Sequence, residues 1–264
     1  LQDALNLSPT FSLLWVGMED IFGYASVGGH NKTIPSSSAF SADLDVMLSS
    51  LTSTGAKGAI ANIPDLTSFP FYTLVAWNRA ELDQNKVDSL NDLYQLQGVT
   101  HINFVVGNNG FVIGDSSHSS GFRQMVDGEY ITLTVPLDSM RCYLYGLVLN
   151  LIHDRYALDA SEVQIINTAI SEYNSVIQQK ATQYGLALVD MNAFFKTVES
   201  GINWNGVAYD AEFVSGGFFS LDGYHPNQKG YGMLTNEFIK AINTQYNAVI
   251  PTTNCVGCVG IKFP

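Results

Sequence analysis

Charged side chains are scarce in this sequence, and cations are scarcer than anions. Of the 264 residues, 14% are charged, and 12 Lys and Arg against 24 Asp and Glu give a net charge of -12. The cations are scattered singly, so there is no basic patch to neutralise phosphates, which argues against a nucleic-acid partner. No apolar run approaches the ~20 residues that span a bilayer. The hydrophobic fraction, 46%, is sufficient for one domain, or one domain with an insertion.

Cysteines are also few, three in all, too few for a disulfide framework. Cys255 and Cys258 have the spacing of half a zinc site or a redox pair, but no second Cys/His pair at metal spacing accompanies them. We interpret them as an incidental pair or a local disulfide in an oxidising compartment. Cys142, near the apolar Met140 and Tyr143, is predicted to be a buried small hydrophobe rather than a nucleophile.

The apolar pattern in the first third predicts a parallel strand–helix–strand unit. Residues 11–17 run apolar up to a glycine, which is typical of a fully buried strand. A second buried strand is expected at 59–63, with Asn62 near its end to hold loops or to serve the structure. Between the two strands, one helix face is formed by Phe40, Leu44, Met47, Leu48 and Leu51. This order implies a right-handed parallel unit.

The last third of the sequence again alternates predicted helices with a predicted strand. A long helix is predicted to begin at the capping-box spelling Ser161-x-x-Gln164 and to end before Gly185. A third short strand at 186–191 ends near Asp190, which is either a ligand-facing carboxylate or a loop anchor. The last helix is expected to run from Pro226, as its first residue, to about Tyr246. Its predicted inward residues are Tyr231, Leu234, Phe238, Ile242 and Tyr246.

Residues 101–135 differ from their surroundings. The segments 103–107 and 130–136 are β-branched or apolar, with Gly, Asn and Ser between them. We interpret this region as an inserted hairpin or small sheet that forms a rim over the site.

An acid stands three residues before a histidine in Asp222-Gly223-Tyr224-His225, on a short turn that precedes the last helix. Such a turn can fold the carboxylate onto the near ring nitrogen, which fixes the tautomer and leaves the far nitrogen as a base. Taken alone, the same spacing also fits a surface turn whose aspartate caps the helix.

The wider block resembles a known family. Residues 216–231 read Gly-Gly-Phe-Phe-Ser-Leu-Asp-Gly-Tyr-His-Pro-Asn-Gln-Lys-Gly-Tyr, which resembles the C-terminal block of the SGNH (GDSL-type) hydrolases, most closely the secreted bacterial lipase/esterase branch. Residues 61–65, 121–124 and 236–243 resemble the same branch, so the resemblance runs from the first residues to about Pro251. In that family the block supplies the Asp and His of a Ser-His-Asp triad, which match Asp222 and His225.

The resemblance implies a fold and a domain plan. It implies a three-layer α/β/α architecture with a parallel, flavodoxin-like sheet, here without its leading strands and with a β-rich insertion. The hydrolase-like domain would cover residues 1–251, with the insertion at about 101–135, and residues 252–264 would be a C-terminal tail.

Gly17 and Glu19 match the family's Gly-x-Asn-Asp position, where the Asn side chain helps to form the oxyanion hole. An ionised Glu19 has no N–H to donate and would repel an oxyanion, so only its protonated form could act. The substitution predicts a weakened oxyanion site.

Ser116 lies in Gly114-Asp115-Ser116, a match to the family's nucleophile motif in the wrong context. That motif should precede the Gly-x-Asn-Asp strand, whereas Ser116 follows it in a Ser- and His-rich loop, so Ser116 is not expected to be the nucleophile. His118 is expected to be solvent-exposed rather than a general base. A metal site around His30, Asp115 and His118 is set aside because the ligand spacing is wrong.

The two leading family blocks, including the nucleophile serine, have no counterpart in these residues. We expect either the C-terminal portion of a longer protein or a chain that has lost its catalytic start, and Leu1 favours the former. A sheet without leading strands exposes a hydrogen-bonding edge. We therefore predict that the insertion, a partner chain or the absent segment covers that edge.

The expected function is acyl-ester hydrolysis without metal or cofactor, on a small-molecule or lipid ester. The alternative is a catalytically degenerate scaffold that binds a glycan or an acylated ligand, with Trp204 and Tyr209 as candidate contacts. The resemblance also implies export, to periplasm, outer membrane or medium.

Overall fold

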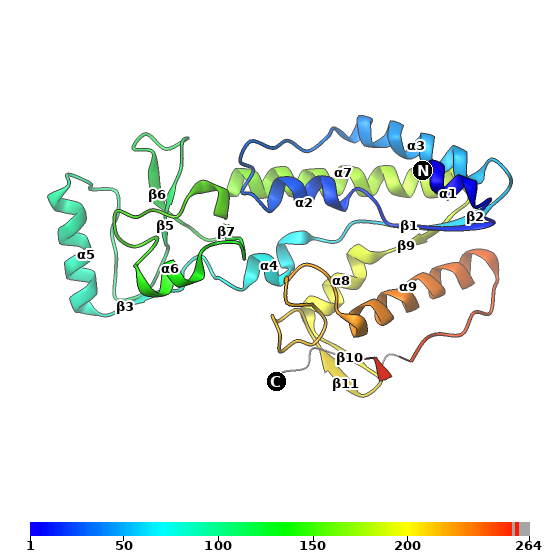
Figure 1. The fold of residues 1–264 in the computed structure, drawn as a ribbon. Coiled ribbons are helices and arrows are strands. Elements are labelled where there is room, and N and C mark those ends of the chain that lie inside the picture. The colour runs from blue at the N-terminus through cyan, green and yellow to red at the C-terminus, as the bar shows by residue number, and fades with distance from the viewer. Residues whose placement is uncertain (255–256, 259–264) are drawn as a thin grey trace. The chain divides into compact units, whose positions relative to one another are not determined.

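The computed structural model describes residues 1–254 and 257–258, which form two compact units (Figure 1). Unit 1 comprises Leu1–Phe22, Ile34–Pro70 and Ile166–Pro264, and unit 2 comprises Gly23–Thr33 and Phe71–Ile165. The helices α2 (Met18–Ala25) and α7 (Ala160–Tyr184) run across the boundaries. The predicted insertion, residues 101–135, falls within unit 2.

Unit 1 is built on a three-stranded parallel sheet of order β1-β2-β9, which confirms the predicted parallel strands. These are β1 (Phe11–Leu14), β2 (Lys57–Ala61) and β9 (Ala187–Val189). The centre of the sheet is apolar, with Ala59, Ile60 and Ala61 fully buried. A hairpin, β10 (Ile202–Trp204) with β11 (Val207–Tyr209), completes the strands of unit 1 within the described residues.

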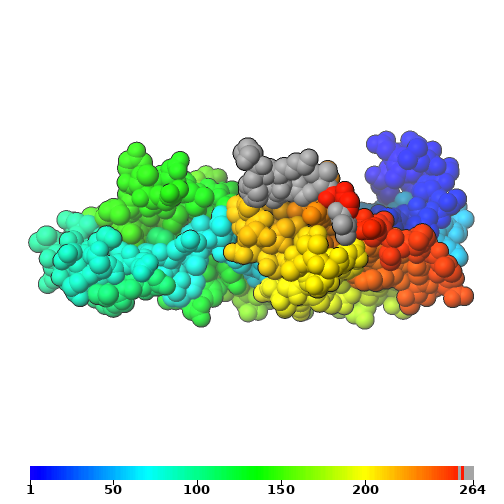
Figure 2. Space-filling model, turned by 90° about the horizontal axis from the view of Figure 1, so that it is seen from below, coloured from blue at the N-terminus to red at the C-terminus, as the bar shows by residue number. Residues whose placement is uncertain are grey.

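Helices lie on both sides of this sheet (Figure 1). On one side are α3 (Ser37–Thr52) and α7, joined by Phe40 stacked on Tyr173 at 4.0 Å between ring centroids. The predicted core face of α3 is confirmed, with Phe40, Leu44, Leu48 and Leu51 buried. On the other side are α8 (Met191–Ser200) and α9 (Gln228–Tyr246). The shorter elements are α1 (Gln2–Asn6) and the 3₁₀ turn η1 (Leu66–Ser68), while α4 (Pro70–Thr73) begins at the last residue of this segment of unit 1 and continues into unit 2. The helix α1 buries no residue and projects from the surface (Figure 2).

The first strand is shorter and less buried than predicted. It ends at Leu14, and Leu13 and Phe11 are 61% and 39% exposed, because β1 pairs on one side only. The prediction of a fully buried strand was therefore wrong. Phe11 contacts the ring of Tyr246 on α9, and no strand among the described residues pairs with the outer edge of β1.

The helix ends also correct the sequence analysis. The first residue of α9 is Gln228, not Pro226, and Asn227 is its N-cap, whose side chain accepts from Lys229 N–H and Gly230 N–H. Tyr231, predicted to point inward, is 48% exposed, whereas the predicted inward residues Leu234 and Ile242 are buried. Likewise the capping box of α7 pairs Asp159 with Glu162, each side chain accepting the other's backbone N–H at 2.8 Å.

Unit 2 consists of three two-stranded antiparallel pairs with two helices. The pairs are β3 (Ala80–Leu82) with β4 (Gly107–Asn109), β5 (Val112–Gly114) with β6 (Phe122–Gln124), and β7 (Tyr130–Ile131) with β8 (Ala157–Leu158). The two helices that lie wholly within it are α5 (Gln84–Leu96) and α6 (Leu137–Cys142), and it also contains the 3₁₀ turn η2 (Asp154–Tyr156). The unit has its own core, which includes Tyr94, Phe104 and Ile152.

The strands of unit 2 are displaced from their predicted positions. The segment predicted at 103–107 is a loop that leads into β4, and the segment at 130–136 is a strand over Tyr130–Ile131 alone. Among the described residues, no helix combines the length and the apolar character required to cross a bilayer.

Candidate active site

Asp222 and His225 form a hydrogen-bonded pair on the turn before α9. Oδ2 of Asp222 lies 2.7 Å from Nδ1 of His225. The other oxygen, Oδ1, accepts from the Ser220 hydroxyl at 2.7 Å and from the backbone N–H of Tyr224 and of His225 at 3.0 and 2.9 Å. The turn is closed by Ser220 N–H donating to the His225 carbonyl at 2.8 Å. As predicted, the turn folds the Asp222 carboxylate onto the near ring nitrogen of His225.

Hydrogen bonding keeps this carboxylate ionised. Burial alone would raise the pKa of Asp222, but the bonds from Ser220, from the Tyr224 backbone and from His225 lower that pKa to about 2. An anionic acceptor at Nδ1 favours the tautomer with the proton on Nδ1, which leaves Nε2 as an acceptor. Because the His225 side chain is 54% exposed, a reacting group can reach Nε2.

Aromatic packing fixes the turn beside the end of β1. Tyr224 is 3% exposed and stacks on Phe22 of α2, with ring centroids 3.7 Å apart. Its hydroxyl donates to Oε1 of Glu19 at 3.2 Å. On the other flank, Phe219 is 1% exposed and lies 5.0 Å from the Phe69 ring. The turn is therefore held at the carboxyl end of a parallel strand, where open α/β sheets place their ligands.

Gly17 and Glu19 lie at this strand end, where the sequence predicted the oxyanion region. Gly17 has φ +90, and a Cβ there would come within 2.8 Å of the Phe40 ring, so the position requires glycine. Glu19 is in the first turn of α2, and its carboxylate accepts from Tyr224. The structure thus brings Glu19 and the Asp222–His225 turn together, while the effect of Glu19 on an oxyanion stays a prediction.

Two further features of this site were not predicted from the sequence. Ser220 lies two residues before Asp222, a spacing that local side-chain hydrogen bonds favour, and it supplies the hydroxyl that binds Oδ1. Tyr224 and Glu19 are 205 residues apart, so no local pattern could pair them.

Ser116 lies on an exposed turn of unit 2. Oδ1 of Asp115 organises that turn by accepting from the N–H and hydroxyl of Ser117, while Oδ2 accepts from Arg123 at 2.6 Å. Within the described residues, the Ser116 hydroxyl makes no hydrogen bond to a histidine. His118 is partly buried rather than fully exposed, and its Nδ1 lies 2.7 Å from the Ser120 hydroxyl.

The cysteines, the candidate aromatic contacts and the metal-ligand types were the other residues considered from the sequence. Cys142 is exposed, so its prediction as a buried hydrophobe was wrong; α6 buries none of its residues. Cys255 lies outside the described residues, so its pairing with Cys258 stays a prediction. Tyr209 is 5% exposed and belongs to the core, whereas the Lys240 ammonium lies over the Trp204 ring, 5.2 Å from its centroid. The described residues contain no cluster of three or more His, Cys, Asp or Glu suited to a metal.

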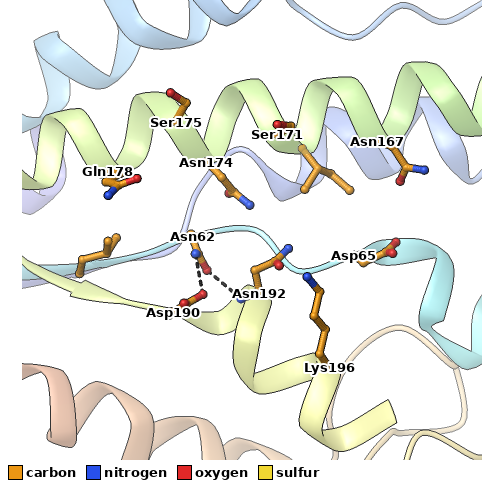
Figure 3. Close-up of a pocket in the computed structure, with 12 residues that line it drawn as sticks. Asn62, Asp65, Asn167, Ser171, Asn174, Ser175, Gln178, Asp190, Asn192 and Lys196 are labelled. Carbon is orange, nitrogen blue, oxygen red and sulfur yellow. Dashed lines mark hydrogen bonds between the residues drawn. The ribbon is translucent and has the colours of Figure 1, made fainter. Parts of the chain in front are cut away.

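Asn62 and Asp190 anchor the ends of β2 and β9 to each other (Figure 3). The Asn62 amide donates to Oδ1 of Asp190 at 2.8 Å, and its oxygen accepts from the backbone of Asn192 at 2.8 Å. Asp190 also caps α8 by accepting from Ala193 N–H. Of the two roles foreseen for Asp190, the structure shows the loop anchor.

Comparison with known proteins gives one match. The family model of the GDSL-like lipases/acylhydrolases matches residues 123–238, less than half of the chain. This confirms the resemblance over those residues; the match contains Asp222 and His225, and it does not reach Gly17, Glu19 or Ser116. No curated protein and no solved structure matches the chain.

Proposed function

We propose that the protein is a serine-type ester hydrolase of the SGNH kind. In this proposal, His225 is first the general base and then the general acid, and Asp222 orients it. The observation that supports this most is the 2.7 Å contact between Oδ2 of Asp222 and Nδ1 of His225, within the segment that matches the acylhydrolase family. The three-layer architecture of that family, with leading strands beyond β1, belongs to the same proposal.

The reaction proposed is acyl transfer in two steps. A serine hydroxyl attacks the ester carbonyl while Nε2 of His225 takes its proton, and the imidazolium then protonates the leaving alcohol. A water molecule then attacks the acyl-enzyme while Nε2 of His225 takes its proton, and the imidazolium protonates the serine oxygen as the acid product leaves. Asp222, ionised at neutral pH because its pKa is about 2, stabilises the imidazolium in both steps.

The oxyanion is proposed to lie at the start of α2. The first backbone N–H groups of a helix lack intrahelical acceptors, and those of α2 begin at Met18, directly after Gly17. The Glu19 carboxylate accepts from Tyr224 and is not a donor in this arrangement.

The nucleophile is proposed to come from outside residues 1–264. Within the described part of the chain, Nε2 of His225 has no hydroxyl or thiol hydrogen-bonded to it, and the sequence context disfavours Ser116. The substrate proposed is a small-molecule or lipid ester, and the location proposed, by resemblance, is outside the cytoplasm.

The test is ester hydrolysis by the full-length protein on p-nitrophenyl acetate and butyrate. His225→Ala should lower kcat/KM by about 10³-fold or more, since it removes the proton-transfer group. His153→Ala is the matched control, because His153 is 55% exposed, against 54% for His225, and also contacts an aspartate, Asp154. Equal activity in both variants would refute the assignment of His225.

A second candidate is a binding module on a degenerate hydrolase scaffold. It is favoured by one observation, that Glu19 stands as a hydrogen-bond acceptor where the family has a donor. On this alternative, the wild-type full-length protein hydrolyses no ester, and an acylated ligand binds without turnover. The buried Tyr209 cannot serve as the aromatic contact foreseen for such a ligand.

A further inference from the structure

A cavity of about 550 Å³ lies in unit 1, apart from the Asp222–His225 pair (Figure 3). Its walls are α7 on one side and α8 with the ends of β2 and β9 on the other. The volume is in the usual range for small-molecule sites. The lining differs from that of an acyl-chain site, because all but two of its residues, Ile170 and Leu188, are polar or charged.

Part of this polar lining holds the walls in place. The Asn174 side chain clamps the backbone of Ile63, accepting from its N–H at 2.7 Å and donating to its carbonyl at 2.8 Å. Asn192 donates to the same carbonyl at 2.9 Å. Together with the Asn62–Asp190 anchor, these bonds tie α7 and α8 to the sheet and fix the shape of the cavity.

Another part of the lining has no partner within the described residues. The side chains of Asn167, Ser171 and Gln178 line the cavity from α7, and none of them makes a hydrogen bond there. Lys196 extends from α8 toward α7, and it forms no ion pair with any described residue (Figure 3). All four residues are exposed, so the cavity is open to solvent on this side and a ligand can reach their polar groups in exchange for water.

The chemistry of the four groups selects the class of ligand. Carboxamides and hydroxyls both donate and accept hydrogen bonds, and so do the hydroxyls of a polyol, whereas a phosphate only accepts. Two carboxylates in the lining, Asp65 and Asp190, outnumber the single Lys196 and oppose an anion. We propose that this cavity binds a neutral polyhydroxylated ligand, a saccharide. The proposal does not rest on ester hydrolysis.

The test measures binding of glucose, galactose, N-acetylglucosamine, maltose and cellobiose to the full-length protein, by saturation-transfer NMR and calorimetry. At least one saccharide should bind. Lys196→Ala and Ser171→Trp should each weaken it by about tenfold or more, by removing a donor and by filling the cavity. Thr182→Ala is the control on α7, because Thr182 is exposed outside the cavity and bonds only the Gln178 carbonyl of its own helix.

Two probes exclude other ligand classes, and a melting curve of each variant confirms its fold. Inorganic phosphate and butyrate should not bind in competition with the saccharide. The proposal is overturned if no saccharide binds the wild type, if both cavity variants bind as the wild type does, or if phosphate displaces the sugar. Since binding is measured without turnover, these results are independent of whether His225 is catalytic.

Discussion

Replacing Asp222 by asparagine tests how the acid controls the tautomer of His225. Oδ1 of Asp222 accepts three hydrogen bonds, from the Ser220 hydroxyl and from the N–H groups of Tyr224 and His225. An asparagine must place its oxygen there, because an NH₂ group would face two N–H donors. Its NH₂ group would then occupy the position of Oδ2 and donate to Nδ1 of His225.

The asparagine would therefore reverse the tautomer of the His225 ring. With Nδ1 as acceptor, the ring proton moves to Nε2, and Nε2 can no longer accept the proton of a nucleophile. A loss of about 10⁴-fold in kcat/KM is expected, equivalent to about 5.5 kcal/mol of transition-state stabilisation. The fold should persist, since the bonds to Oδ1 are kept.

The assay is ester hydrolysis together with ¹⁵N NMR of the histidine rings. The proton of His225 should be on Nδ1 in the wild type and on Nε2 in Asp222→Asn, with unchanged thermal stability. Asp154→Asn is the control, because Asp154 also contacts a histidine but lies in unit 2. An Asp222→Asn protein that keeps activity within tenfold of the wild type would show that Asp222 does not control the tautomer of a catalytic His225.

Three other predictions follow from single contacts. Ser220→Ala removes a hydrogen-bond donor to Asp222, so the pKa of Asp222 should rise and kcat/KM should fall by roughly fivefold, about 1 kcal/mol. Carboxyl ¹³C titration measures the pKa and steady-state kinetics measure kcat/KM. An unchanged pKa of Asp222 would contradict this prediction. Gly17→Ala should destabilise the fold by about 1–3 kcal/mol, because φ is +90 and the Phe40 ring blocks the new methyl group; a urea midpoint equal to the wild type contradicts it. Burial raises the pKa of Glu162 from 4.5 to about 7, so the folded state holds its proton longer than the unfolded chain and stability falls as pH rises through that interval. Glu162→Gln, which can keep the accepted N–H bond, should therefore be more stable than the wild type at pH 8 and lose that advantage at pH 4 in urea unfolding; a pH-independent difference contradicts this.

Where sequence periodicity spans many residues, it predicts structure well here. The helix α3 was expected from one apolar face, and Phe40, Leu44, Leu48 and Leu51 are buried in the structure. A short apolar run is less informative, because it does not distinguish a central strand from an edge strand. For this reason β1 was expected to be buried, although Leu13 is largely exposed.

The candidate site also contains some features that could be predicted from the sequence and others that could not. The Asp222–His225 pair could be predicted from the resemblance of residues 216–231 to the family block, because the spacing of the two residues alone also fits a surface turn. The contact of Tyr224 with Glu19 could not be, because it joins residues far apart in the chain and depends on the packing of Tyr224 on Phe22. The end of β1 could be predicted as a ligand position only through the resemblance to a family.

The proposed Ser-His-Asp mechanism is best tested by fluorophosphonate labelling of the full-length protein, with the labelled residue located by intact mass and peptide mapping. One labelled serine is expected, outside residues 1–264, and the label should be lost in His225→Ala but not in His153→Ala. A label on Ser116, a label that persists in His225→Ala, or no label at all would contradict this mechanism.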